Sequence, residues 1–214
     1  MAARSGRWLP RAFYDRPTLD VARDLLGKVL VHNRRGVVTS GVVIEVEAYI
    51  GESDPACHAA PGPTTRNEPL YGEPGFAYVY LNYGIHYLFN VVTEHAGSPA
   101  AVLVRALEPL DGVPVMRSRR LRGAASRTTA IRDHDLCRGP GNLTVAMGIT
   151  LADNRADLAG GRLFLEDRAI EVGEIAWGPR VGISVGTDRR WRAYLAAHPA
   201  VSATRSLPAR SRRR

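Results

Sequence analysis

The sequence predicts a single-domain α+β protein in which helices pack against a mainly antiparallel sheet. Two hairpin patterns carry this prediction, because an apolar strand pattern resumes after the turns at 34–36 and 82–84. One helical pattern precedes the first hairpin, at residues 17–26, and another lies at 112–122. A chain of 214 residues is long enough to bury a substantial core and suits one domain.

The returning strand of the first hairpin, residues 37–49, carries two carboxylates on one face. Its side chains alternate, so one face is apolar and the other holds Glu45, Glu47 and Tyr49. A solvated outer face is one interpretation of such a pattern. The following sequence favours another, because the strand breaks and His58 comes soon after. An acid, an aromatic ring and an imidazole therefore meet at one strand end, which is the candidate active site.

The remaining elements follow from apolar periodicity and from glycine and proline breaks. We expect further strands at 28–32, 76–81, 85–92, 100–106, 163–166, 170–172 and 180–185, and further helices at 128–137 and 143–147. The irregular stretch at 51–75 is stiffened by prolines, and ordered loops of this length are usually functional.

The chain divides into three segments. Residues 1–12 are expected to form a loose basic N-terminal arm, and residues 13–204 form the domain. Residues 205–214 form a basic C-terminal tail that we expect to be disordered.

The formal net charge of +8 suits a polyanionic partner, of which nucleic acid is the commonest. A coding bias toward arginine is the alternative, because Lys28 is the only lysine. That bias explains why arginine replaces lysine, but it does not explain the surplus of basic over acidic residues.

Composition and motifs exclude several other classes. No apolar run is long enough to span a bilayer, and no secretory signal follows Met1, so we expect a cytoplasmic, nucleoid-associated protein. Cys57 and Cys137 lack metal-site spacing and are expected to be buried, inert thiols. The zinc-deaminase signature is absent, and Lys28 has no polar neighbours that would make it a Schiff-base nucleophile.

The remaining chemistry is that of an enzyme that excises a base from duplex DNA. Aromatic rings can grip any planar base, and a carboxylate such as Glu47 can deprotonate a water that attacks C1′ of the sugar. Tyr83, at a hairpin tip, could enter a base stack in place of an extruded nucleotide.

Several motifs, in this order, resemble the alkyladenine (3-methyladenine, 3-methylpurine) DNA glycosylase family. The resemblance runs from about Tyr14 to Ser202 and therefore covers nearly the whole chain. The segments that carry it are 45–49, 54–58, 65–67, 78–84, Asn90, 104–109 and 136–143.

The resemblance implies roles for matching residues. Glu47 would be the general base, and Arg105 would position the attacking water and the adjacent phosphate. Four residues would line the base pocket, with an Asn at its floor that disfavours the amino group of guanine: Tyr49, His58, Tyr80 and Asn90. Tyr83 would intercalate into the duplex, and three further residues would contact DNA: Arg66, Ile85 and His86.

The resemblance also implies a curved, open-barrel-like sheet similar to the C-terminal domain of a formyltransferase. It implies a monofunctional, monomeric enzyme with no metal, no cofactor and no membrane partner, acting on double-stranded DNA that contains damaged bases. Glu45 is expected to have a structural or hydrogen-bonding role, because positively charged alkylated purines leave without an acid. Neutral lesions need an acid that the sequence does not identify. A non-catalytic nucleic-acid-binding module on the same fold is the alternative function.

Overall fold

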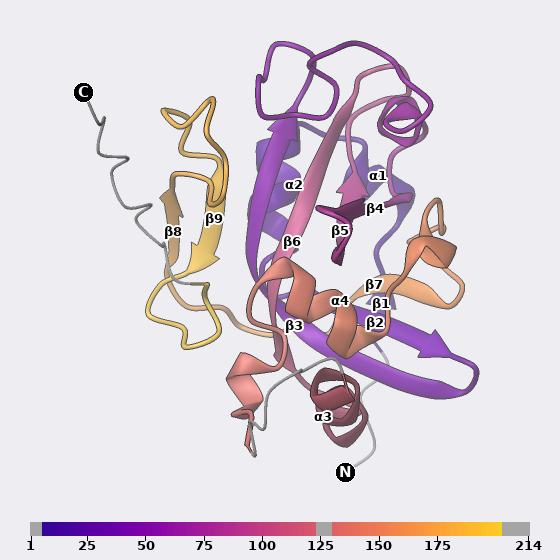
Figure 1. Cartoon of the computed structure of the whole chain (residues 1–214), viewed down its shortest axis with the longest axis vertical. Coiled ribbons are helices and arrows are strands. Elements are labelled where there is room, and N and C mark those ends of the chain that lie inside the picture. Colours follow the sequence, from indigo (N-terminus) through magenta and orange to yellow (C-terminus); the bar gives the residue numbers. More distant parts are fainter. Residues whose placement is uncertain (1–5, 123–129, 203–214) are drawn as a thin grey trace.

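In the computed structural model, which describes residues 6–122 and 130–202, nine antiparallel strands form one sheet that curls into an open half-barrel (Figure 1). The order along the sheet is β1-β7-β2-β3-β6-β5-β4, and β9 pairs with both β3 and β8. The strands are β1 Arg7–Trp8, β2 Val29–Arg34, β3 Val37–Ile50, β4 Ala77–Asn82, β5 His86–Val92, β6 Ala100–Pro109, β7 Leu163–Asp167, β8 Ile175–Gly178 and β9 Arg192–Leu195. The predicted α+β class and the curved antiparallel sheet are confirmed.

Helices cover both sides of the central strands. The α-helices are α1 Arg11–Tyr14, α2 Thr18–Leu25, α3 Val113–Arg122 and α4 Pro140–Met147, and short 3₁₀ turns lie at Glu68–Tyr71, Asp133–Asp135 and Leu151–Asp153. Figure 1 shows α2 behind β3 and β6, and α4 in front of them. In the described part of the chain, no helix is long and apolar enough to cross a bilayer.

The strand β3 is long enough to change partners along one edge. Its first half pairs with β2 as far as Val42, and residues 45–47 pair with β9. The opposite edge pairs with β6, and its register shifts around Glu45. Such a bulge increases the local twist of a strand, which accounts for the curl of the sheet at this point.

Both faces of β3 are buried over most of its length. Glu45 and Glu47 have no solvent exposure, so the interpretation of a solvated outer face is wrong. Two carboxylates inside a sheet need partners that compensate for lost hydration. Those partners come from β3 itself, from β6 and β9, and from the loops around them.

The two predicted hairpins are confirmed, and the second has a strained tip. At that tip the backbone φ angles are positive at both Tyr83 (49°) and Gly84 (69°). Glycine accepts this conformation readily, but tyrosine does so at an energetic cost. The predicted helix at 17–26 is also confirmed as α2, with Gly27 just beyond its end at a φ of 84°.

Several predicted elements were wrong or had different bounds. The strand expected at 100–106 continues to Pro109, which places Arg105 inside β6 rather than at its end. The strands expected at 170–172 and 180–185 do not form, and the strands in this part of the chain are β8 and β9. Gly182 and Gly186 have positive φ angles, and such angles interrupt an extended strand.

Two further corrections concern the chain ends and the segment after α3. Of the arm expected to be loose, Arg7 and Trp8 pair with β7. The described part of the helix expected at 128–137 contains only the 3₁₀ turn at Asp133–Asp135. The tail at 205–214 lies outside the described residues. Cys57 and Cys137 are buried thiols, as expected.

Candidate active site

Glu47 lies near the C-terminal end of β3, where three hydrogen bonds hold its carboxylate. Oε2 accepts from the hydroxyl of Tyr49 at 2.9 Å and from Nη1 of Arg105 at 3.2 Å. Oε1 accepts from the backbone N–H of Val181 at 2.6 Å. Burial raises the pKa of Glu47 above its ordinary value of 4.5, while the guanidinium and the two other donors oppose that rise. A raised pKa makes the carboxylate a stronger proton acceptor.

Arg105 joins the two buried carboxylates of β3. Its Nε donates to Glu45 Oε1 at 3.1 Å, and its Nη1 donates to Glu47. Glu45 is otherwise occupied by Arg192 and by Ser202, whose backbone N–H and hydroxyl both donate to it at 2.7 Å. These contacts agree with the structural role expected for Glu45.

A cavity of about 520 Å³ opens beside this cluster, a volume typical of small-molecule sites. Arg105 and Val181, which bind Glu47 directly, also line the cavity, whereas Glu47 lies behind them. Its lining includes all four predicted pocket residues: Tyr49, His58, Tyr80 and Asn90. Residues 139–142, at the start of α4, form another part of its wall.

Three aromatic side chains pack together on one wall of the cavity. The ring centroids of His58 and Tyr80 are 4.4 Å apart, and those of Tyr78 and Tyr80 are 5.2 Å apart. Nδ1 of His58 lies 2.9 Å from the hydroxyl of Tyr78. Burial lowers the pKa of His58, and the nearby Arg66 lowers it further. Burial also raises the pKa of Tyr78 to about 12, so this wall is uncharged at neutral pH.

Asn90 is fixed at the junction of β4, β5 and β6. It pairs with Tyr78 across one edge of β5 and with Leu103 across the other. Its side-chain amide donates to the carbonyl of Tyr78 at 3.0 Å, and the residue is buried. An amide held in this way presents a rigid polar group to whatever enters the cavity.

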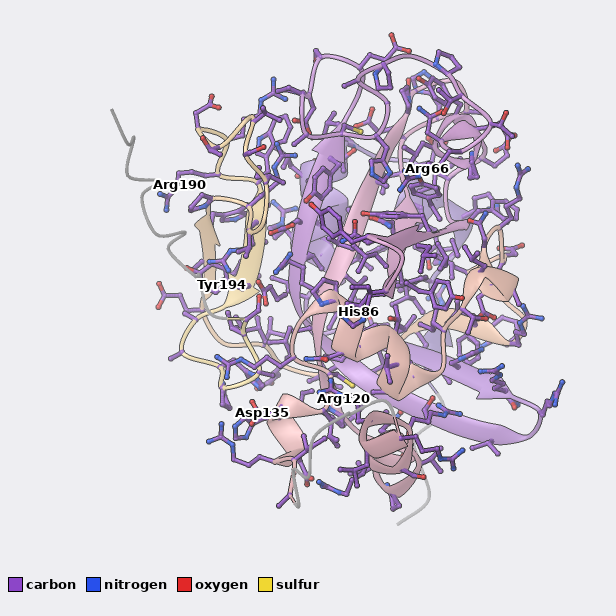
Figure 2. All side chains as sticks on the ribbon, in the orientation of Figure 1. Arg66, His86, Arg120, Asp135, Arg190 and Tyr194 are labelled. Atoms are coloured by element: carbon purple, nitrogen blue, oxygen red, sulfur yellow. The ribbon has the colours of Figure 1, made fainter. Side chains whose placement is uncertain are left out.

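The hairpin between β4 and β5 projects from the mouth of the cavity. Tyr83 is 87% exposed and Ile85 is 73% exposed, so two apolar side chains stand in solvent at its tip. Tyr83 and His86 line the cavity, whereas Ile85 lies outside it. Figure 2 shows His86 beside α4, where its ring packs so closely on Gly141 that a Cβ there would clash.

Arg66 approaches the cavity from the loop at 51–75. Its guanidinium lies 5.6 Å from the centre of the Tyr80 ring, and the side chain is exposed. Figure 2 shows it well separated from His86, on the other side of β4. A cation in this position is available to a phosphate near the mouth.

Some residues of the site were missed from the sequence. Val181 was expected only inside a strand at 180–185, Ser202 lies in a segment for which no element was expected, and Tyr78 was expected only as a strand residue. Residues 182–186 read Gly-Ile-Ser-Val-Gly, which matches the pattern of a nucleophile elbow. The pattern lies in the loop between β8 and β9 instead of between a strand and a helix, so it lacks the context of that motif.

Comparisons with known proteins agree with this architecture. A relative from Methanocella arvoryzae is 49% identical over 198 residues, which cover 91% of this chain and 95% of the relative. A relative from Prosthecochloris aestuarii is 43% identical over 206 residues, and one from Burkholderia lata is 46% identical over 190 residues. The alignments cover 95% of both chains in the former case and 87% of both in the latter. All three relatives are provisionally named 3-methyladenine DNA glycosylases.

The sequence pattern of the methylpurine-DNA glycosylase (MPG) family matches residues 12–199. The match covers most of the chain, and it includes the strands and loops that form the cavity. The protein therefore belongs to the methylpurine-DNA glycosylase family.

Proposed function

We propose that this protein is a monofunctional DNA glycosylase that removes alkylated purines such as 3-methyladenine from duplex DNA. The observation that carries the proposal is the position of Glu47, a buried carboxylate directly behind an aromatic-walled cavity. Membership of the methylpurine-DNA glycosylase family and the names of the relatives support the same activity.

The cavity supplies what a flipped purine needs. The rings of Tyr49, His58 and Tyr80 offer π-faces for stacking, which bind a planar base whatever its substituents. The exposed ring of Tyr83 fills the gap that the nucleotide leaves in the duplex. Asn90 excludes bases with an amino group at the position where guanine has one.

Glu47 activates the water that attacks C1′. Among the described contacts, its Oε1 accepts only the N–H of Val181, so one lone pair remains for that water, which has to enter beside Val181 and Arg105 because Glu47 itself does not line the cavity. The water proton passes to Glu47 as the oxygen bonds to C1′, and the electrons of the C1′–N bond leave with the purine. An alkylated purine carries a positive charge, so it departs as a neutral base without an acid. The negative charge of the Glu47 carboxylate also favours the oxocarbenium-like transition state.

Arg105 has two tasks in this reaction. Its bonds to Glu45 and Glu47 keep the Glu47 carboxylate charged and correctly oriented. It also lines the cavity, where it faces the water and the phosphate next to the lesion. All these groups come from one chain, and the proposed enzyme acts as a monomer. It works on chromosomal DNA in the cytoplasm, and Arg66, Ile85 and His86 contact the duplex around the lesion.

Incubation of the protein with methylated duplex DNA in EDTA tests the proposal. The expected result is release of methylated adenine and formation of an abasic site, with no strand break until alkali is added. If lesion DNA is bound but no base is released under any of these conditions, the protein is instead a nucleic-acid-binding module. A panel of duplexes that contain single lesions then defines which other bases are released.

A further inference from the structure

A buried ion pair joins two loops that border the cavity. Nη1 of Arg180 donates to Oδ2 of Asp54 at 2.5 Å, and Nη2 donates to Oδ1 at 2.8 Å. Both side chains are completely buried, although 126 residues separate them. Asp54 lies in the loop that carries His58, and Arg180 lies in the loop between β8 and β9.

This pair adjoins two of the three donors to Glu47. The residue after Arg180 is Val181, whose N–H donates to Oε1 of Glu47. The guanidinium of Arg180 also lies 4.6 Å from the ring centre of Tyr49, whose hydroxyl donates to Oε2 of Glu47. One side chain therefore fixes both a backbone donor and an aromatic donor on the same carboxylate.

Other contacts of Arg180 and Asp54 hold the surrounding backbone. Arg180 donates to the carbonyl of Ala48 at 3.0 Å, which anchors it to β3 itself. Asp54 accepts from the N–H of Ala56 at 3.2 Å and thus orders the turn that leads to His58. Neither Arg180 nor Asp54 lines the cavity.

We propose that Arg180 and Asp54 are positioning residues for base excision, which act by holding the hydrogen bonds of Glu47 and one wall of the pocket. A buried ion pair is a weak source of net stability, because dehydration of both charges offsets their attraction. Its bidentate geometry and stacked guanidinium instead suit precise placement of the loops. The inference rests on the proposed glycosylase function for its effect on rate.

The tests use Asp54→Asn, which keeps the shape of the side chain, and Arg180→Lys, which keeps the charge but loses the planar fork. Each variant is first checked for folding by circular dichroism. We expect the single-turnover rate of base release to fall about 10- to 100-fold, with lesion-DNA affinity nearly unchanged. The double variant should lose about as much as the worse single variant, because the two residues act as one unit.

Titration of Glu47 with pH distinguishes a positioning role of the Arg180–Asp54 pair from a role in stability alone. The N–H of Val181 and the hydroxyl of Tyr49 lower the pKa of Glu47, so their displacement should raise it. The carboxyl carbon of Glu47 can be followed by ¹³C NMR titration, with Glu47→Gln to assign its signal. Asp153→Asn is the matched control, because Asp153 is a buried, arginine-paired acid that does not line the cavity. That variant should be less stable than wild type, but the pKa of Glu47 in it should be unchanged.

The outcomes remain distinct from those of the proposed function. If wild-type protein releases no base, the glycosylase proposal fails, while the NMR titration still decides whether the pair positions Glu47. If Asp54→Asn and Arg180→Lys only lower the melting temperature, with the titration and the rate unchanged, the pair is structural and the inference is overturned.

Discussion

Nη1 of Arg105 lies 3.2 Å from Oε2 of Glu47, and both side chains are buried where β3 meets β6. Burial favours the neutral carboxylic acid, whereas the guanidinium favours the charged carboxylate. Burial has the larger effect, and the pKa of Glu47 is raised. A general base must be deprotonated to act, so this balance sets the lower pH limit of the proposed reaction.

Replacement of Arg105 by Gln should move that limit to higher pH. Loss of the cation removes a group that lowers the pKa of Glu47, so the acid limb of the pH–rate profile should shift upward. The rate at neutral pH should fall by about 100-fold, and raising the pH should recover part of the loss. Single-turnover base release across the acidic and neutral range measures both effects.

Arg192→Gln is the matched control for this experiment. Arg192 is a buried arginine whose backbone pairs with Glu47 across β3 and β9, but its side chain donates to Glu45 and to the carbonyl of Ser202 instead of to the Glu47 carboxylate. Its loss should lower stability but leave the acid limb in place. An acid limb that stays fixed in Arg105→Gln would argue against Glu47 as the titrating base.

The raised pKa of Glu47 also predicts how stability depends on pH. A carboxyl group whose pKa is higher in the folded state stabilises the protein fully below its unfolded pKa, and that contribution is lost as pH rises through the folded pKa. Glu47→Gln lacks this dependence. The free energy of unfolding of the variant minus that of wild type should therefore increase with pH over this window. Urea denaturation at a series of pH values checks the sign, and a difference that falls with pH would contradict it.

Removal of the ring at the hairpin tip should weaken DNA binding without loss of the fold. We expect Tyr83→Ala to lose about 1–3 kcal/mol of affinity for lesion DNA, the usual value of one stacked ring. Tyr83→Gly should bind as weakly but melt no lower than Tyr83→Ala, because glycine accepts the φ of 49° without strain. Leu81→Ala, another exposed apolar residue of the hairpin, is the control. Unchanged excision by Tyr83→Ala would exclude intercalation of Tyr83 from the mechanism.

Truncation of the pocket floor should relax the choice of base. Asn90→Ala removes the amide that is held on the carbonyl of Tyr78, at a cost of about 1 kcal/mol in stability. The ratio of guanine-derived to adenine-derived bases released from methylated DNA should rise. Asn82→Ala removes an amide from a different part of the cavity wall and should leave the ratio as in wild type. If both variants leave it unchanged, Asn90 does not set selectivity.

The sequence predicts those parts of the site that depend on local patterns. Alternation placed Glu47 and Tyr49 on one face of β3, and they are hydrogen-bonded there. The turn at 82–84 located the hairpin that carries Tyr83. These features need only the period of a strand and the chemistry of a turn.

The parts that could not be predicted depend on contacts between distant, irregular segments. Val181 reaches Glu47 from 134 residues away, and Ser202 reaches Glu45 from 157 residues away. Both belong to loops whose conformation is set by tertiary packing. The predicted strand at 180–185 failed for the same reason, because the buried pair of Arg180 with Asp54 and the turns at the nearby glycines determine that segment.

Glu47 is proposed to activate the attacking water, and a comparison of Glu47→Gln with wild-type protein is the sharpest test of that role. The measurement combines single-turnover base release and equilibrium binding, on one duplex that contains a single alkylated adenine. We expect the variant to bind this duplex as tightly as wild type and to release base at least about 100-fold more slowly. Release at the wild-type rate by a correctly folded Glu47→Gln protein would exclude Glu47 as the general base.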